Sequence, residues 1–266
     1  MTRHAIDDRI VIELSNNIAT VSFARPAKLN ALDMPMFLAI EKTMKWIKRR
    51  ADVRVVIVRG EGQSFCSGLD IKAVMTNKSN AIKLLWKWLP GNANLAQRVT
   101  VGWRRLPMPV VMAIHGKCWG GGMQIALGGD YRIASADASF AVMESRWGLI
   151  PDMGGTLAMQ ENMSVDQAIR VSSTAETLTA QQAYELNLIS QIADDPYQAA
   201  CDYANLLIER SPDVTTTIKS LYHKLWCGNE RRILARETIN QWRMIVSKNR
   251  AIAVQKALGK DPGDFV

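Results

Sequence analysis

Two short runs of apolar residues constrain the fold of this chain more than any other feature of its sequence. The segment Val53–Val58 is rich in β-branched residues, and Val110–Ile114 is apolar throughout. Runs of this length without strict alternation are typical of strands buried on both faces, as in a parallel sheet covered by helices. Glycine-containing turns follow both runs, at Gly60–Gly62 and at Gly120–Gly122. The chain is therefore predicted to be an α/β protein.

The residues before the first run predict two strands and a helix. Ile10–Leu14 and Ile18–Phe23 read as strands separated by the turn residues Ser15–Asn17. Asp33 is a favourable N-cap residue, and Pro35 suits the first turn of the helix that follows. That helix carries apolar residues at three- and four-residue spacing on one face: Phe37, Ile40, Met44 and Ile47. The resulting order of strand, strand, helix and strand recurs loosely further along the chain.

The second half of the chain begins with strands and ends with helices. Short strands are expected at Tyr131–Ala134 and Ser139–Met143. Thr179 and Gln182 have the spacing of a capping box, and few strand signals follow them. The expected division places the core and active site in residues 1–200 and a helical region in residues 201–266.

Composition and charge bound the class of protein. The chain has 266 residues and a formal net charge of +8, which is long enough to bury a core without disulfides. Its four cysteines show neither zinc-site spacing nor a dense disulfide framework. The N-terminus lacks the apolar stretch of a secretory signal, and no apolar run is long enough to cross a bilayer. We expect a cytoplasmic protein without a membrane partner.

The segment His115–Gln124 is the first candidate for a site. It places three glycines, Gly120–Gly122, between a buried strand and a helix, where the backbone can approach a ligand closely. The first N–H groups of that helix have no intrahelical acceptor, so they can hold a phosphate or a developing oxyanion. A purely structural turn is the alternative. The spacing matches neither a dinucleotide fingerprint nor a P-loop.

Two further segments, taken with this one, resemble a known family. Ser64–Lys72 follows the first buried run, and Phe140–Thr156 begins within the last of the short strands. In this order and spacing they are similar to the crotonase superfamily, also called the enoyl-CoA hydratase/isomerase family. Arg25–Leu32 resembles the family's N-terminal signature, and the likeness extends over Ile10–Ile192.

The resemblance implies a fold, an assembly and a substrate. The fold is a crotonase-like spiral of repeated ββα units with a C-terminal helical trimerisation region. The assembly is a homotrimer or a dimer of trimers, and the substrate is an acyl-CoA. Coenzyme A is then part of the substrate, and neither a further cofactor nor a metal is expected. The backbone N–H groups of Leu69 and Gly121 are implied as an oxyanion hole.

The resemblance also implies contacts with coenzyme A. The implied residues flank the matched motifs and comprise Lys28, Ser67, Gly68, Asp70 and Lys72, with Lys260 as a late basic candidate for the phosphates.

Three side chains are the catalytic candidates: Glu144 and Asp152 for proton transfer, and Gln124 only for positioning. Hydratases of the family hold water with two glutamates, whereas this chain has Gln124 and Glu144 at those positions. A glutamine cannot exchange a proton at neutral pH, so Glu144 is the leading general base and acid. Asp152 stands where dienoyl-CoA isomerases of the family carry an acid, while single-carboxylate isomerases use the Glu144 position alone. Hydration and isomerisation both remain open.

Each of these residues also has a structural interpretation. Glu144 could be a surface carboxylate paired with Arg146, Asp152 could cap the helix that follows it, and Gln124 could be an ordinary first-turn residue. His115 is interpreted as a packed residue rather than a catalyst. The Trp-rich segment 75–106 is either part of an acyl pocket or an amphipathic helix.

The favoured function is an enoyl-CoA hydratase/isomerase that transfers protons through a stabilised enolate, in fatty-acid or related acyl-CoA catabolism. The alternative is a crotonase-fold binding protein with affinity for RNA and little catalysis. The basic character of the chain favours that alternative, because a basic surface can serve nucleic acid as well as a polyphosphate ligand. Of the two functions, RNA binding is the less favoured, so a nucleic-acid partner is not expected but stays an alternative.

Overall fold

The structure is a computed structural model. It describes residues 2–75, 78–86, 88–89, 92–225, 243, 247–257 and 259–266. Part of the predicted C-terminal helical region, residues 226–242 and 244–246, lies outside this set.

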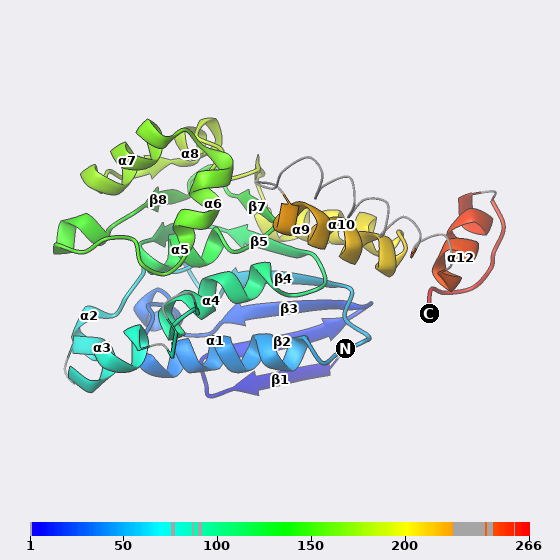
Figure 1. Ribbon diagram of the computed structural model, residues 1–266, viewed down its shortest axis with the longest axis horizontal. Helices are drawn as coiled ribbons and strands as arrows, with labels where there is room; N and C mark the ends of the chain where they lie inside the picture. Colours follow the sequence, from blue (N-terminus) through cyan, green and yellow to red (C-terminus); the bar gives the residue numbers. More distant parts are fainter. Residues whose placement is uncertain are drawn as a thin grey trace.

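The larger sheet has seven strands in the order β1-β2-β3-β4-β5-β7-β10 (Figure 1). Their bounds are β1 Thr2–Ile6, β2 Ile10–Ser15, β3 Ile18–Phe23, β4 Val55–Gly60, β5 Val110–Ile114, β7 Tyr131–Ala134 and β10 Gln191–Ile192. The pairings β1–β2 and β2–β3 are antiparallel, and every later pairing is parallel. Both apolar runs of the sequence are central strands, which confirms the predicted α/β class.

Alternate side chains of the central strands enter two different hydrophobic layers. Val56 and Val58 of β4 belong to the larger core cluster. Their neighbours Val55 and Ile57 belong to a second cluster on the opposite face of the sheet. Because both faces are covered, these strands need no polar positions here, and this explains the continuous apolar stretches Val55–Val58 and Val110–Ile114.

Helices cover both faces of the sheet (Figure 1). Those of the first two thirds of the chain are η1 Pro26–Lys28, α1 Met34–Ile47, α2 Ile71–Met75, α3 Lys78–Leu85, α4 Leu95–Arg104, α5 Gly121–Ala126, η2 Glu144–Trp147, α6 Gly155–Asn162 and α7 Val165–Thr174. The later ones are α8 Ala180–Glu185, α9 Pro196–Ile208, α10 Pro212–Leu225 and α12 Lys248–Ala257. Helix α1 packs beside α4, and α9 packs against β4, β5 and β7.

The predicted helix caps are confirmed. The Asp33 carboxylate accepts the Met36 N–H at the start of α1. Thr179 and Gln182 form a reciprocal capping box at the start of α8. Such caps satisfy N–H groups that have no acceptor inside the helix.

The expected division near residue 200 falls inside α9. Ala200 and Ala204 of this helix are fully buried against the sheet. Helix α9 therefore belongs to the core layer. Helix α10 is joined to the sheet by Lys219, whose ammonium is buried and lies 2.7 Å from Asp130. Within the described residues, no helix is long and apolar enough to cross a bilayer.

Two features of the fold were not expected. Strand β1 was missed, since four of its five residues are exposed and it lies at the sheet edge, where no buried pattern marks it. Among its described residues, the Trp-rich segment 75–106 contains two helices, α3 and α4, in place of the single amphipathic helix considered from the sequence. Trp103 is buried in the core, whereas Trp86 and Trp88 are 60% and 79% exposed.

A second, smaller sheet positions the candidate site. It has the order β6-β8-β9, with bounds Lys117–Trp119, Ser139–Ala141 and Leu178–Thr179. Strands β6 and β8 are parallel, with Cys118 opposite Phe140. The segments that leave their carboxyl ends, α5 and η2, therefore begin side by side.

Candidate active site

The three segments singled out in the sequence converge around Gly120. Its N–H donates to the Ala141 carbonyl at 2.8 Å, which joins the glycine loop to the end of β8. A Cβ atom built on Gly120 would lie 3.9 Å from the Glu144 Oε1 atom and 3.9 Å from the Gly68 Cα atom. Gly120 also has φ of 50°, a conformation that favours glycine. The lack of a side chain at this position leaves open the space between the three segments.

The Leu69 N–H has a direction fixed by its neighbours. The Leu32 N–H donates to the Gly68 carbonyl at 2.8 Å, and the Asp70 N–H donates to the Leu32 carbonyl at 3.0 Å. In a planar trans peptide the carbonyl and the following N–H point in opposite directions. Because the Gly68 carbonyl faces Leu32, the Leu69 N–H faces away from Leu32.

The Gly121 N–H lies close to this loop. Gly121 is the first residue of α5, where helical geometry provides no intrahelical acceptor for the N–H. A Cβ atom built on Gly68 would lie 3.5 Å from the Gly121 nitrogen. The structure thus brings together the two residues implied for the oxyanion hole, on adjacent segments.

Gln124 is held in one orientation by three hydrogen bonds. Its side chain is buried, and its Oε1 atom accepts the N–H groups of Met153 at 2.9 Å and Gly155 at 3.2 Å. Since both of those groups can only donate, the amide nitrogen must face the other way. There Nε2 donates to the Glu144 Oε1 atom at 2.5 Å. Gln124 is therefore not an ordinary first-turn residue.

Glu144 presents its second oxygen without a partner. Oε2 is buried and has no hydrogen-bond partner among the described residues. Burial is the main cause that raises the pKa of Glu144; the Gln124 hydrogen bond opposes this rise, and the nearby charge of Asp152 adds to it. No ion pair joins Glu144 to Arg146 within the described part of the chain, so the paired surface carboxylate is not what the structure shows. A half-buried carboxylate with one buried oxygen that has no partner is suited to proton transfer.

Asp152 does not cap the helix after it. The N-cap of α6 is Gly154, at φ of 88°, and no side chain caps this end. Burial raises the pKa of the Asp152 carboxyl. The charge of Asp152 in turn adds to the raised pKa of Glu144, so the two carboxyl groups lie in one neighbourhood.

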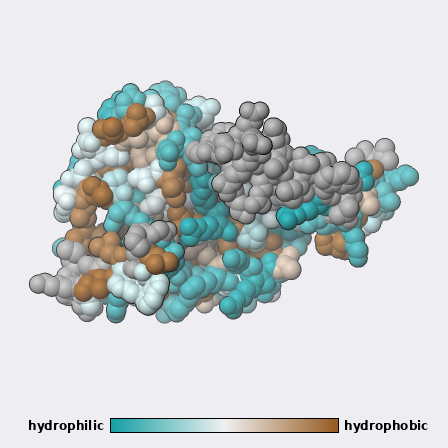
Figure 2. All heavy atoms as spheres, viewed as in Figure 1, coloured by the Kyte–Doolittle hydropathy of each residue, from teal (hydrophilic) through white to brown (hydrophobic). Residues whose placement is uncertain are grey.

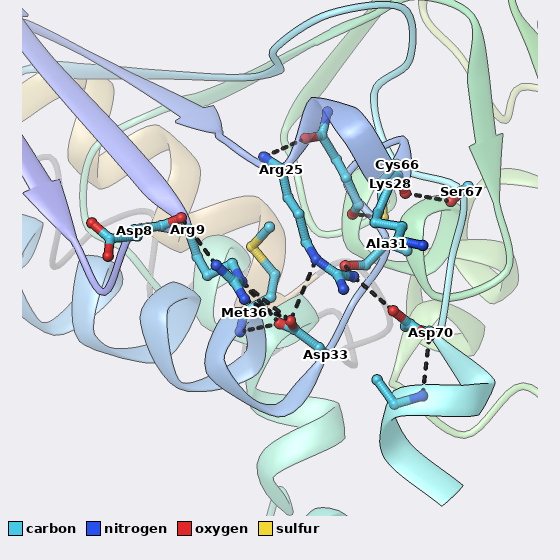
Figure 3. A network of polar contacts seen from close by, with 12 residues as sticks. Asp8, Arg9, Arg25, Lys28, Ala31, Asp33, Met36, Cys66, Ser67 and Asp70 are labelled. Atoms are coloured by element: carbon cyan, nitrogen blue, oxygen red, sulfur yellow. Dashed lines mark hydrogen bonds and ion pairs between the residues drawn. The ribbon is translucent and has the colours of Figure 1, made fainter. Parts of the chain in front are cut away.

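The residues implied for coenzyme A lie at the end of η1 (Lys28), in α2 (Lys72) and in the connecting segment before α2 that contains Ser67, Gly68 and Asp70. Lys28 and Lys72 are exposed, and the Ser67 hydroxyl lies 3.5 Å from the Lys28 carbonyl (Figure 3). Gly68 has φ of 93°, which suits only glycine. The Lys260 N–H donates to the Gln255 carbonyl of α12 at 3.0 Å, and Figure 1 shows α12 well away from α5 in the same chain. Lys260 therefore lies apart from the other candidates within one protomer.

Asp70 has structural contacts that sequence reasoning missed. One carboxylate oxygen accepts the Ala73 N–H at 3.1 Å, and the other lies 2.9 Å from the Arg25 guanidinium. The Ala73 hydrogen bond is the main cause that lowers the pKa of Asp70, and Arg25 adds to this effect. In the sequence, Arg25 is notable only as the first residue of the Arg25–Leu32 motif. No pattern in the sequence indicates its salt bridges.

The thiols and the histidine near the site are packed groups. Burial raises the pKa of Cys66 to about 12 and raises that of Cys118 as well. Neither thiol is therefore ionised at neutral pH. The His115 Nε2 atom lies 2.9 Å from the Gly62 carbonyl, at the end of β5. In the described residues, no group of histidine, cysteine and carboxylate side chains has the arrangement of a metal site.

Exposed apolar side chains lie on the face shown in Figure 2. They gather over α3 and the residues that follow it, and over α7: Ile82, Leu85, Trp86, Trp88, Leu89, Val165 and Ile169. The rings of Trp86 and Trp88 contact each other edge to face, with centroids 6.2 Å apart. Apolar clusters of this kind on a protein surface commonly mark binding regions.

This chain is similar in sequence and in fold to known proteins. The chain is 30% identical to the 1,2-epoxyphenylacetyl-CoA isomerase of Escherichia coli (strain K12) over 70% of each protein. Its fold matches the enoyl-CoA hydratase of Bacillus anthracis with a TM-score of 0.86 at 23% identity, covering 96% of this chain and 98% of that one. It matches the enoyl-CoA hydratase of Mycobacterium tuberculosis H37Rv with a TM-score of 0.84 at 22% identity, covering 96% and 98%.

A match to the family as a whole completes the comparison. The sequence profile of the enoyl-CoA hydratase/isomerase family matches residues 13–258, nearly the whole chain. The predicted crotonase-like fold and the predicted family are confirmed, and the chain belongs to the enoyl-CoA hydratase/isomerase family of the crotonase superfamily.

Proposed function

We propose that this protein is an enoyl-CoA isomerase that moves a carbon–carbon double bond with Glu144 as the principal proton carrier. The observation that carries the proposal is the set of hydrogen bonds around Gln124. Its Oε1 atom already accepts two backbone N–H groups, and its Nε2 atom donates to Glu144. The hydratase position is thus occupied by a group that neither exchanges protons nor has an oxygen available to hold water.

Isomerisation needs one base that later acts as an acid. In the proposed reaction, Glu144 removes a proton from C2 of a 3-enoyl-CoA, and the electron pair delocalises onto the thioester oxygen as a dienolate. Glu144 then returns the proton to C4, so that the double bond lies between C2 and C3. No water is consumed. The partnerless Oε2 atom of Glu144 is the proposed proton carrier.

The thioester oxygen is proposed to bind the N–H groups of Leu69 and Gly121. Both belong to segments that meet at Gly120, and negative charge on the oxygen grows as the proton leaves. Donors that are already in place stabilise this charge without reorganisation, and removing one such donor typically costs ~10²–10³ in rate. Asp152 is proposed as an auxiliary acid, because its charge influences the ionisation of Glu144.

Contacts with the remainder of the substrate complete the proposal. Lys28 and Lys72 are proposed to face the phosphates of coenzyme A, and the loop containing Ser67 and Gly68 to lie along it. The acyl chain is proposed to lie beside the exposed apolar residues of segment 75–106. The only cofactor-like group is then the coenzyme A of the substrate itself. We further propose a cytoplasmic homotrimer or dimer of trimers, which light scattering can test.

A substrate panel tests the proposed reaction. Purified protein is supplied separately with 3-enoyl-CoA and 2-enoyl-CoA thioesters, and products are separated by chromatography. We expect 3-enoyl-CoA to be converted to 2-enoyl-CoA, with little 3-hydroxyacyl-CoA formed from either substrate. Rapid formation of 3-hydroxyacyl-CoA would instead identify a hydratase.

Hydration is the second candidate because the charge of the Asp152 carboxyl contributes to the raised pKa of Glu144. A water molecule held between these two carboxyl groups would restore a hydratase-like pair with a different geometry. RNA binding stays a prediction. An RNA titration at several salt concentrations tests it, since phosphate contacts produce a steep salt dependence.

A further inference from the structure

Arg25 is a mostly buried arginine next to the oxyanion loop, the segment Gly68–Asp70 that contains the Leu69 N–H. Its side chain is 17% exposed and lies between the carboxylates of Asp33 and Asp70, which are 8% and 18% exposed (Figure 3). The guanidinium Nε atom is 3.4 Å from the Asp33 Oδ2 atom, and NH1 is 2.9 Å from the Asp70 Oδ2 atom. One guanidinium therefore joins two carboxylates that are distant in the sequence.

Each carboxylate also caps a helix through its other oxygen. The Oδ1 atom of Asp33 accepts the Met36 N–H at 2.9 Å, and the Oδ1 atom of Asp70 accepts the Ala73 N–H at 3.1 Å. The division of the two oxygens is the same in both residues, with Oδ1 on the helix and Oδ2 on Arg25. Arg25 thereby links the first turns of α1 and α2.

The same guanidinium holds both sides of the bridge that directs the Leu69 N–H. NH1 donates to the Ala31 carbonyl at 3.0 Å and also binds Asp70. Ala31 precedes Leu32, and Asp70 follows Leu69, so the bridge between Leu32 and Leu69 lies directly between these two contacts. A single nitrogen atom thus restrains the two chain segments whose hydrogen bonds aim the Leu69 N–H.

We propose that Arg25 is a positioning residue for the oxyanion hole, acting through Asp70 and Ala31 on the direction of the Leu69 N–H. Arg25 itself touches neither the thioester nor the proton-carrying group. This inference rests on the proposed function, because it assumes that the Leu69 N–H binds the thioester oxygen.

An arginine suits this role better than a lysine. Its planar guanidinium presents several N–H groups in fixed directions, so it can bind Asp33, Asp70 and a carbonyl at once. A lysine ammonium has the same charge but lacks the planar array of N–H groups in fixed directions. Losing the link should therefore misplace the Leu69 donor rather than remove it.

The expected effect falls on turnover more than on binding. Complete loss of an oxyanion donor costs ~10²–10³ in rate, and a misplaced donor should cost somewhat less, roughly 10–100-fold in kcat. Affinity for a saturated acyl-CoA, which forms no enolate, should change by less than about threefold because the remote contacts remain.

The experiment compares Arg25→Gln with a matched control, Arg9→Gln. The Arg9 guanidinium binds the same Asp33 carboxylate, with NH2 to Oδ2 at 3.0 Å, and none of its contacts is with Asp70 or Ala31 in the described structure. Both variants lose an ion pair to Asp33, but only Arg25→Gln releases the oxyanion loop. We expect Arg9→Gln to lower the melting temperature with kcat close to wild type, and Arg25→Gln to lower both.

A spectroscopic measurement separates positioning from general loosening. A 3-oxoacyl-CoA ionises to an enolate with a distinct ultraviolet absorbance, and an intact oxyanion hole favours that form when the ligand is bound. We expect the enolate fraction at fixed pH to fall in Arg25→Gln and to stay near wild type in Arg9→Gln. Arg25→Lys should give an intermediate fraction.

The kcat values and enolate fractions of these variants distinguish a positioning role of Arg25 from a purely structural one. If Arg25→Gln and Arg9→Gln behave alike in kcat and in enolate fraction, Arg25 has only a structural role and the inference is wrong. If Arg25→Gln does not fold, Asp70→Asn serves instead, because asparagine still caps α2 while losing the charge that binds Arg25. An unchanged enolate fraction in that variant would equally overturn the inference. Absence of enoyl-CoA turnover in the wild type would instead refute the proposed function.

Discussion

Replacing Gln124 by glutamate would place a second carboxylate against Glu144. A glutamate oxygen would take the position from which Nε2 now donates at 2.5 Å. Two ionised carboxylates with charges about 4 Å apart repel by about 4 kcal/mol at an effective dielectric of about 20, which corresponds to about three pKa units. The N–H groups of Met153 and Gly155 would still favour charge on residue 124, so the retained proton should reside mainly on Glu144.

The sign of the resulting pH dependence follows from linkage. A carboxyl group whose folded pKa is raised binds more protons in the folded state than in the unfolded state. The Gln124→Glu variant should therefore match wild-type stability in mild acid and lose up to about 4 kcal/mol of unfolding free energy as pH rises through the raised pKa.

Urea unfolding between about pH 5 and pH 9 measures this difference. The matched control is the double variant Gln124→Glu with Glu144→Gln, which keeps one carboxylate and one carboxamide in exchanged positions. It should lack the additional loss of stability in alkali. If the single variant shows no pH dependence beyond that of the wild type, the contact between residues 124 and 144 does not exist as described.

The remaining predictions concern the proton carriers and the glycine loop. Glu144→Gln should lower kcat by ~10²–10⁴-fold. It should also raise the melting temperature at neutral pH, because the pKa of Glu144 is raised and its ionised form therefore destabilises the fold above that pKa. In the wild type, kcat/KM should fall as pH falls through the raised pKa of Glu144, and a flat acid limb would contradict its role as base. Asp152→Asn should lose rate with little change in melting temperature; full activity would remove Asp152 from the mechanism. Gly122→Ala should lower the free energy of unfolding by ~1–3 kcal/mol in urea unfolding, because its Cβ would lie only 2.4 Å from the Cys66 carbonyl oxygen. The control Gly148→Ala has nothing within 4 Å of the added atom and should cost about 1 kcal/mol.

The sequence predicted those parts of the fold that depend on local chemistry or strong burial. The cap at Asp33 and the capping box at Thr179 need only neighbouring N–H groups, so short-range patterns reveal them. The central strands were visible because both of their faces are apolar. Strand β1 was missed because its exposed side chains carry no such pattern.

The residues of the candidate site could be predicted from the sequence, but the directions of their hydrogen bonds could not. Gln124 was expected only to position other groups, and its bonds to Met153 and Gly155 depend on residues 29 and 31 positions away. The direction of the Leu69 N–H likewise depends on its bridge with Leu32. Residue spacing within a motif contains no information about such partners, and only the assembled fold supplies them.

The tight packing around the glycine loop has a consequence for how such an enzyme could acquire a new activity. Gly122 has no room for a side chain, whereas Leu69 contributes a main-chain group that most side-chain replacements at that position leave in place. Laboratory evolution would therefore find most single changes at Gly122 inactivating and most changes at Leu69 silent. Variation at residues 124, 144 and 152 would instead alter which protons move, while the proposed enolate-binding backbone stays unchanged. A library restricted to these three positions should sample new reactions far more efficiently than one that also randomises the loop.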